Sequence, residues 1–382
     1  MEQARQRYEK RGKEGRSRLL DEVCALCGYE RKYASKILCG QRAIAGRSGR
    51  RRGGSQALYG AVEREVVKAI WLRAEQPCGK RLKPTLALWL PYHEKRQGRL
   101  PRALRRKVLA ASPATLDRLL APCRVALGSR GRCGTRPGTL LRRQIPIRTE
   151  HWEVDGPGFI EADTVAHCGE SMAGEFCWSI TATDVQTQWT ETRAVPNRGQ
   201  AAVAERIAQI EASLPFPILG FDTDNGGEFL NWHLVDYFNK RPQPVGFTRS
   251  RAYRKNDNAR VEQKNWTHVR QLVGYGRLEG AEVAELLDDL YRQEWSWFRN
   301  FFCPVMKHLR TEIKGSRKRR IYDLPATPFA RLQACPQSDP AQLARLGKLL
   351  ATLDPFELKE RIEQKLRAIL RHEIRRPIYQ AA

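Results

Sequence analysis

An apolar run that ends in carboxylates is the feature that most constrains this sequence. The run "FPILGF", residues 216–221, leads directly into "DTDNGGEF", which contains two aspartates, an asparagine and two glycines. Carboxylates at the end of a buried strand cost free energy unless cations, hydrogen bonds or a metal ion compensate them. The stretch therefore predicts a strand whose end lies at a site for positive charge.

The charge of the chain is unevenly distributed. Its 382 residues include 68 Lys and Arg against 42 Asp and Glu, a formal charge of +26. Residues 1–150 hold 36 basic and 12 acidic side chains, residues 151–278 hold 13 and 16, and residues 279–382 hold 19 and 14. Basic segments around an acid-rich middle predict a polyanionic partner, and we expect nucleic acid. With no apolar run of about 18 residues, we expect a cytoplasmic protein without a membrane segment.

Residues 1–50 are predicted to form a helix-turn-helix DNA-binding domain. Two helical patterns in residues 17–40 meet at Gly28, which suits the turn between them. The apolar or small residues of this pattern are Val23, Cys24, Cys27, Tyr29, Ala34 and Ile37. Arg31, Lys32 and Lys36 are expected on the outer face of the second helix, where they would contact DNA.

Residues 55–125 are predicted to form a second helical DNA-binding module. Ser112 precedes Pro113, a pairing that suits an N-cap and the first residue of a helix. We expect a short basic helix to end at Ala111, and Thr115 and Arg118 to face DNA. Residues 126–150 are predicted to be a basic linker, because Gly, Arg and Pro dominate and five arginines lie between residues 130 and 143.

Residues 151–278 change to alternating strand and helix patterns, which predicts an α/β core with a mixed sheet. The expected strands are 158–165, 175–185, 188–195, 216–224 and 244–250, and the expected helices are 199–214, 229–240 and 259–275. Residues 279–382 are predicted to be a mostly helical C-terminal region. Its helical periodicity covers 281–302 and 340–374, and 314–329 is predicted to be a basic loop.

Three acidic residues of the core segment could meet at one site. Asp163 lies in a predicted strand, Asp224 ends another, and Glu262 lies early in a predicted helix. Carboxylates placed in this way can hold two divalent cations about 3.5–4 Å apart. Oxygen ligands without a His and Cys set favour Mg²⁺ or Mn²⁺ over Zn²⁺.

The three acidic blocks carry a resemblance to a known family. "ADTVAH", "TDNGGEF" and "SRAYRKNDNARVEQKN" resemble the blocks of the Asp-Asp-Glu integrase core, which retroviral integrases share with many bacterial insertion-sequence transposases. Asp224 and Glu262 have 37 residues between them, which is close to the usual family spacing. The resemblance implies a ribonuclease-H-like fold, with Asp163, Asp224 and Glu262 as the catalytic residues and the ligands of two Mg²⁺ or Mn²⁺ ions.

The same resemblance implies a DNA transposase of a bacterial mobile element. Such an enzyme hydrolyses a phosphodiester at the element end and joins the freed 3′-hydroxyl to target DNA, without a covalent protein–DNA intermediate. It would act as a homo-oligomer on DNA, in the nucleoid. Two other hypotheses remain open: a nuclease of the same fold without strand transfer, and a DNA-binding protein without catalysis.

Two of the acidic positions have alternatives. Asp155 could replace Asp163, although Gly and Pro interrupt the sequence that follows Asp155. Asp222 could replace Asp224, because residues two apart share one face of a strand. The family motif Asp-Asn-Gly favours Asp224, and Glu228 lies in the wrong block to replace Glu262.

Polar and basic residues beside the third block are the remaining candidates for DNA contacts. Arg254, Lys255 and Lys264 lie close to Glu262 in the sequence and are expected to hold phosphates. Asn265 follows Glu262 by three residues, so a helix would place both on one face. We expect Asn265 to contact DNA as well.

Overall fold

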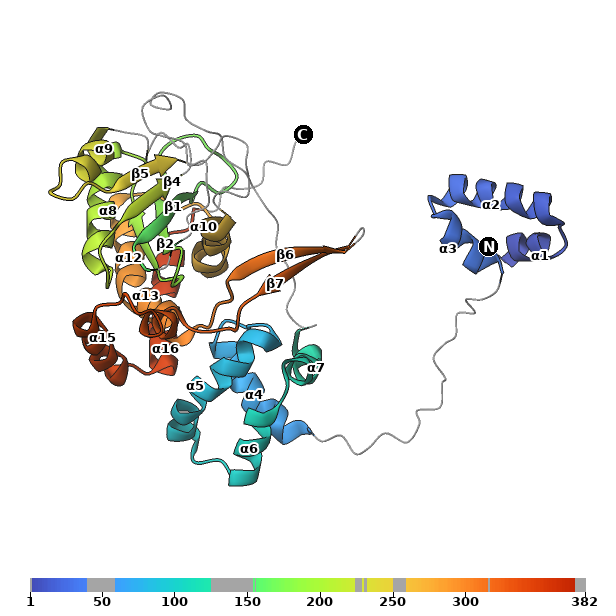
Figure 1. Cartoon of the computed structure of the whole chain (residues 1–382), viewed down its shortest axis with the longest axis horizontal. Helices are drawn as coiled ribbons and strands as arrows, with labels where there is room; N and C mark the ends of the chain where they lie inside the picture. Colours follow the sequence, from blue (N-terminus) through green and yellow to red (C-terminus); the bar gives the residue numbers. More distant parts are fainter. Residues whose placement is uncertain are drawn as a thin grey trace. The chain divides into compact units, whose positions relative to one another are not determined.

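The computed structural model describes residues 2–39, 59–124, 154, 156–223, 229, 232–249, 259–314 and 317–374. The chain divides into two compact units, Met1–Leu58 and Tyr59–Ala382. Both units are drawn in Figure 1, where the colours follow the sequence. None of the helices in the described ranges combines the length and the apolar character that crossing a bilayer requires.

The described part of the first unit, residues 2–39, contains three helices. They are α1 (Glu2–Glu9), α2 (Lys13–Cys27) and α3 (Arg31–Leu38). Gly28 ends α2 with a φ of 64°, a left-handed conformation that glycine adopts at no steric cost. The predicted pair of helices that meet at Gly28 is therefore confirmed. Its small core consists of Tyr8, Leu19, Leu20, Val23, Ala34 and Leu38.

Two residues of the predicted apolar pattern do not pack into the core of this unit. Cys27 and Tyr29 are exposed, because they lie at the end of α2 and in the turn, beyond the face that packs on α3. Leu38, the last residue of α3, is fully buried and belongs to the core of this unit.

The second unit begins with four helices. They are α4 (Ala61–Arg73), α5 (Gly79–Gln97), α6 (Arg102–Ala110) and α7 (Pro113–Arg124). Ser112 caps α7, since its Oγ accepts a hydrogen bond of 3.2 Å from the backbone N–H of Thr115. The predicted cap is confirmed, and so is the short basic helix before it, which ends one residue earlier than expected.

Trp89 of α5 fixes this helical module to the C-terminal helices. Its indole N–H donates to the carbonyl of Phe302 at 3.0 Å. Its ring lies edge-on to Phe298 and Phe356, with centroids 5.8 and 5.1 Å away. Because Trp89 is fully buried, aromatic packing joins residues far apart in the sequence into one core.

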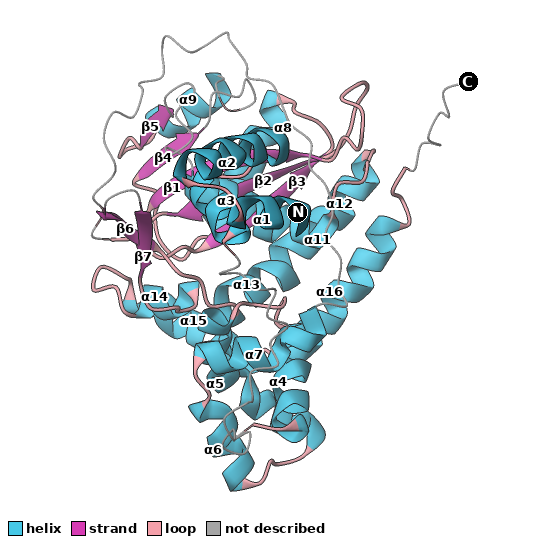
Figure 2. Ribbon diagram, turned by 90° about the vertical axis from the view of Figure 1, so that its right-hand side faces the viewer, coloured by secondary structure: helices cyan, strands magenta, loops and turns pink. Residues whose placement is uncertain are grey.

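A five-stranded mixed sheet forms the centre of the second unit (Figure 2). Its strands are β1 (Phe159–Ala166), β2 (Trp178–Asp184), β3 (Thr190–Val195), β4 (Gly220–Thr223) and β5 (Gly246–Arg249). They lie in the order β3-β2-β1-β4-β5, with β1, β2 and β3 antiparallel and β4 and β5 parallel to β1. The predicted α/β core is confirmed, and this topology agrees with the ribonuclease-H-like fold that the resemblance implies.

The two faces of the sheet differ in chemistry because successive side chains of a strand point to opposite sides. Ile160 and Phe221 are register partners on one face, where Phe221 packs against Phe238 with ring centroids 4.7 Å apart. Phe238 belongs to α9 (Trp232–Asn239). Glu161 and Asp222 are register partners on the opposite face, which is therefore the polar side of β1 and β4.

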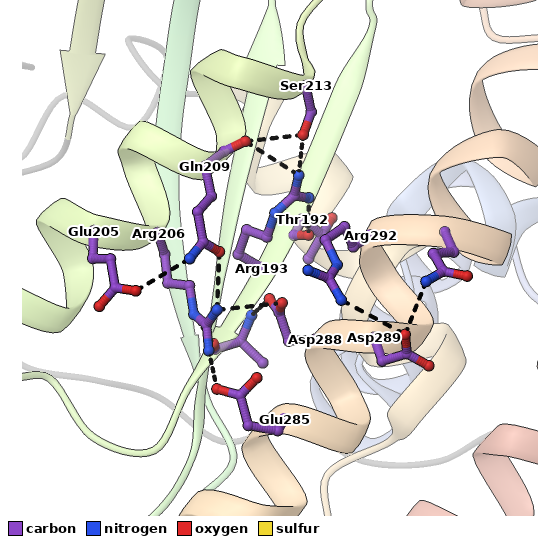
Figure 3. A network of polar contacts seen from close by, with 12 residues as sticks. Thr192, Arg193, Glu205, Arg206, Gln209, Ser213, Glu285, Asp288, Asp289 and Arg292 are labelled. Carbon is purple, nitrogen blue, oxygen red and sulfur yellow. Dashed lines mark hydrogen bonds and ion pairs between the residues drawn. The ribbon is translucent and has the colours of Figure 1, made fainter.

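Helices α8 (Gln200–Ser213) and α12 (Ala281–Leu290) are joined to β3 by the polar network in Figure 3. Asp288 accepts a hydrogen bond of 2.9 Å from the backbone N–H of Ala194 and lies 3.5 Å from the Arg206 guanidinium. Arg193 donates to the Ser213 hydroxyl at 2.5 Å. Burial raises the pKa of Asp288, and the N–H and Arg206 oppose that rise.

The remaining helices follow β5. They are α10 (Ala259–Lys264), the π-helix η1 (Asn265–Arg270), α11 (Gln271–Val273), α12, the π-helix η2 (Tyr291–Trp295), α13 (Ser296–Phe302), α14 (Pro328–Gln333), α15 (Pro340–Thr352) and α16 (Pro355–Leu370). The helical patterns predicted at 259–275 and 281–302 are confirmed, and the pattern predicted at 340–374 forms two helices, α15 and α16. The two π-helical segments within them are not visible in hydrophobic periodicity.

Part of the segment predicted as a basic loop, 314–329, instead belongs to a β-hairpin, and its last two residues begin α14. Strand β6 (His308–Lys314) pairs antiparallel with β7 (Arg317–Tyr322), and the two form a sheet of their own. Figure 1 shows this hairpin as a long ribbon that extends from the body of the second unit. Consecutive basic residues hid the period of two that identifies a strand.

Candidate active site on the mixed sheet

Asp163 lies on β1, between strands β2 and β4. Its side chain is half-buried, and each of its two oxygens accepts a hydrogen bond from a described residue. The backbone N–H of Thr164 donates to Oδ1 at 2.8 Å, and the side-chain amide of Asn265 donates to Oδ2 at 2.7 Å. These two bonds orient the carboxylate, and a carboxylate oxygen can in general accept more than one partner.

The bond to Asn265 brings the helix of the third acidic block onto the strand of the first. Asn265 is the first residue of η1, and 102 residues separate it from Asp163. Glu262 belongs to α10, three residues earlier. The side chain of Glu262 lies outside the described residues, as do Asp224 and the alternatives Asp155 and Glu228.

A second hydrogen bond holds the same helix against β1. The guanidinium of Arg270 donates to the carbonyl of Ala166 at 2.9 Å. Asn265 and Arg270 are the two ends of η1, and their partners Asp163 and Ala166 lie three residues apart on β1. The π-helix is therefore tied to the strand at both ends, and π-helical segments are frequent at functional sites.

Asp222 and Asp224 have different positions in the chain relative to β4. Asp222 lies within the strand and is fully buried, and it accepts a hydrogen bond of 2.5 Å from the hydroxyl of Thr248. Its register partner Glu161 is also fully buried. Asp224 follows Thr223, the last residue of β4, directly in the sequence. The sequence had left Asp222 as an alternative to Asp224. Its burial and its bond to Thr248 favour a structural role for Asp222 within the sheet.

Lys264 was predicted to contact DNA, but the structure places it inside the protein. Its side chain is only 4% exposed, and its ammonium donates to the carbonyl of Gln188 at 3.2 Å. Burial, and then the nearby cations Arg299 and Arg331, lower the pKa of Lys264 well below its usual value. Lys264 lies on the inward face of the helix, so it is not available to a phosphate at the surface.

Directly after β1, three buried polar residues form a series of hydrogen bonds. The Nε2 of His167 and the hydroxyl of Ser179 are 2.7 Å apart, and the Ser179 hydroxyl lies 2.9 Å from that of Tyr291. Burial, and more weakly the Arg270 cation, lower the pKa of His167 from 6.5 to about 3. His167 is thus a neutral structural residue at neutral pH, and sequence periodicity had not singled it out.

No group of three or more His, Cys, Asp or Glu side chains that could hold a metal ion occurs within the described ranges. Of the three predicted ligands, Asp163 alone has a described side chain. Its carboxylate is a hard oxygen donor, half-buried and already oriented, which fits Mg²⁺ or Mn²⁺.

Comparison with known proteins identifies one relative across most of the chain. No family model matches the sequence. The uncharacterized protein y4rM of Sinorhizobium fredii is 40% identical over 344 residues, which cover 87% of this chain and 93% of y4rM. The chain belongs to the y4rM family.

Solved structures that are similar to this y4rM-family protein include the HTLV-2 integrase catalytic core domain in complex with magnesium. The dimeric form is 15% identical, with a TM-score of 0.29, and covers 39% of this chain and 91% of that chain. The trimeric form is also 15% identical, with a TM-score of 0.28, and covers 38% of this chain and 86% of that chain.

The predicted DNA-binding residues of the helical regions of this y4rM-family member lie on the surface. Arg31, Lys32 and Lys36 of α3 are exposed, as the sequence predicted. Arg31 also forms an ion pair with Asp21, so part of its charge is neutralised. These positions are compatible with DNA contacts, which remain a prediction.

In the second helical module, Arg118 of α7 is exposed and donates to the hydroxyl of Thr115 at 3.2 Å. Arg254 and Lys255 lie outside the described residues. Asn265 donates to Asp163, so its amide acts within the protein, and its predicted contact with DNA remains a prediction.

Proposed function

We propose that this y4rM-family protein is a DNA transposase of the Asp-Asp-Glu integrase type. The observation that carries the proposal is the 2.7 Å hydrogen bond between Asn265 and Asp163. It joins the first and third acidic blocks, which the sequence identified independently of any contact between them. A strand and a helix that each carry a candidate metal ligand are thereby held together.

The register of the sheet supports Asp224 as the third member of the site. Glu161 pairs with Asp222 and Ala162 with Thr223 in the parallel pairing of β1 with β4. Asp224 follows Thr223 directly in the sequence, as Asp163 follows Ala162, so the two acidic residues come directly after the last pair of this register. Asp163, Asp224 and Glu262 would then hold two Mg²⁺ or Mn²⁺ ions, which supply Lewis-acid activation of the attacking oxygen and stabilise charge on the phosphate.

Asn265 has a positioning role in this proposal. Its amide holds one oxygen of Asp163 while the backbone N–H of Thr164 holds the other, so the carboxylate cannot rotate away from its ligand position. Partners that orient a metal ligand typically contribute 10–100-fold in metal affinity or activity. The exposed basic residues of α3 and α7 would bind the element ends in DNA, and two ends imply a homo-oligomer in the nucleoid.

The test is a strand-transfer assay with labelled element ends in Mn²⁺. We expect Asp163→Asn, Asp224→Asn and Glu262→Gln each to abolish end cleavage and joining while DNA affinity stays nearly unchanged, because each removes a ligand charge at near-constant volume. Cleavage without joining in the unmodified protein would indicate a nuclease. Binding with neither activity would indicate a DNA-binding protein without catalysis.

Metal dependence gives an independent test. We expect Mg²⁺ or Mn²⁺ to support activity and Ca²⁺ to support it poorly, since Ca²⁺ is larger and coordinates less rigidly. Mg²⁺ should also raise the melting temperature of the unmodified protein, because a ligand of the native state shifts the folding equilibrium. Asp163→Asn should lose most of that increase. Full activity in excess chelator would contradict the proposal.

A further inference from the structure

The hairpin β6–β7 carries a concentration of positive charge that the proposed catalytic site does not use. Its two strands contain six basic residues and one acidic residue. The acid, Glu312, pairs with Arg310 at 2.8 Å. Arg319 and Arg320 of β7 are exposed, and neither forms an ion pair with any part of the chain that the structure describes.

None of the hairpin side chains that the structure describes belongs to a hydrophobic core. Its strands pair with each other and form a separate two-stranded sheet. Leu309 and Tyr322 are 54% and 40% exposed, although such residues are usually buried. Because successive residues of a strand point to opposite faces, Arg319 and Arg320 place charge on both faces of the ribbon.

The base of the hairpin, in contrast, is joined to neighbouring segments by hydrogen bonds. Backbone hydrogen bonds of 2.9 and 3.1 Å join Val305 to Ala326, just outside the two strands. Asp323 accepts from the backbone N–H of Lys307 at 2.7 Å and from the Arg331 guanidinium at 2.5 Å. These bonds attach the base of the exposed hairpin to the body of this unit.

The base is also connected to the helix of the candidate active site. The ammonium of Lys307 donates to the side-chain oxygen of Gln186 at 2.6 Å, in the turn between β2 and β3. In the same turn, the carbonyl of Gln188 accepts from Lys264, the residue before Asn265. The turn that contains Gln186 and Gln188 therefore contacts both the base of the hairpin and the helix that is bonded to Asp163.

We propose that the β6–β7 hairpin is an arm that binds the phosphate backbone of duplex DNA through Arg319 and Arg320. The inference rests on the proposed function, which makes DNA the substrate. Guanidinium groups match phosphate geometry, and the major groove of B-DNA admits a two-stranded ribbon. Pairing with the hairpin of a second copy is disfavoured, because it would bring unpaired arginines together.

The test compares two charge-matched double variants of the full chain. Arg319→Gln with Arg320→Gln removes two charges from the hairpin. Arg345→Gln with Lys348→Gln removes two exposed charges from α15. The Kd for a short labelled duplex of arbitrary sequence is measured by anisotropy in Ca²⁺ over a range of salt concentrations. A third variant, Arg319→Lys with Arg320→Lys, keeps the charge.

We expect the hairpin variant to bind about tenfold more weakly and to lower the salt slope of binding by about 2, since each lost phosphate contact contributes about one unit. The α15 variant should bind nearly as the unmodified protein does. The lysine variant should keep the salt slope, because it keeps both charges, and should lose less affinity than the glutamine variant. Melting temperatures should be unchanged. An equal loss of duplex affinity in the hairpin and α15 variants, or no loss of affinity in either, would overturn the proposal.

Two additional measurements separate the possible failures. Light scattering without DNA reports the oligomeric state. A changed oligomer with unchanged DNA affinity would make the hairpin a protein interface and overturn its DNA-binding role. Strand transfer in Mn²⁺ is scored separately. A protein that binds the duplex through the hairpin but neither cuts nor joins DNA would contradict the proposed function and leave the hairpin inference standing.

Discussion

The side-chain amide of Asn265 lies 2.7 Å from Oδ2 of Asp163, across 102 residues of sequence. Asp163 comes from the middle of the sheet and Asn265 from the first turn of a π-helix. The bond therefore ties the geometry of a candidate metal ligand to the position of the helix that carries Glu262. Any change that moves this helix also moves the carboxylate.

Replacing Asn265 should reduce activity more than stability. We expect Asn265→Ala to lower strand transfer about 10–100-fold and to raise the Mg²⁺ concentration for half-maximal activity, because Asp163 loses its orienting donor. The exposed neighbour Gln263 supplies the control, and Gln263→Ala should have neither effect. An Asn265→Ala protein with an unchanged Mg²⁺ requirement would show that the bond has no positioning role.

Asp222 should behave as a structural residue. We expect Asp222→Asn to retain end cleavage, in contrast to Asp224→Asn. Thr248→Val should lower the free energy of unfolding by about 1–3 kcal/mol, because it removes a hydrogen-bond donor from a buried carboxylate. Urea titration and the cleavage assay measure the two effects. Loss of cleavage in Asp222→Asn with retention in Asp224→Asn would reverse the assignment.

Buried histidine should make the protein less stable in mild acid. The pKa of His167 is about 3 in the folded protein, against an ordinary value near 6.5, so the unfolded chain binds the proton more readily. The contribution of neutral His167 to the free energy of unfolding is fully present above pH 6.5. It is lost as the pH falls toward 3, at about 1.4 kcal/mol per pH unit.

Chemical denaturation between pH 6.5 and 5 measures this loss. His167→Gln should show a shallower decline of the free energy of unfolding over that range. The exposed His308 offers a matched control, and His308→Gln should decline as steeply as the unmodified protein. Equal slopes in all three proteins would mean that His167 does not contribute to the acid sensitivity.

The cap of α7 should contribute measurably to the helical module. Ser112→Ala removes the acceptor of the Thr115 N–H and should cost about 0.5–2 kcal/mol of unfolding free energy. Ser112→Asp should restore most of that loss, because aspartate is an equally good cap. An alanine variant as stable as the aspartate variant would show that the cap is dispensable.

Much of the fold could be predicted from local sequence patterns. Strand β1, helix α8, the turn at Gly28 and the cap at Ser112 all follow from residues within a few positions of one another. Period, capping and turn chemistry act over such short distances, so the sequence alone contains them. The acidic blocks could also be identified in order, because their residue types and spacing are local features.

Other features were decided by contacts between distant residues. The hairpin β6–β7 was hidden because adjacent arginines do not alternate with apolar residues, although strand pairing stabilises them. Lys264 was expected at the surface, but the turn at Gln188 buries it. The sequence by itself determined which residues could bind metal and DNA. Which of them meet, as Asp163 meets Asn265, was decided by tertiary packing, because that contact depends on a strand and a helix about a hundred residues apart in the chain.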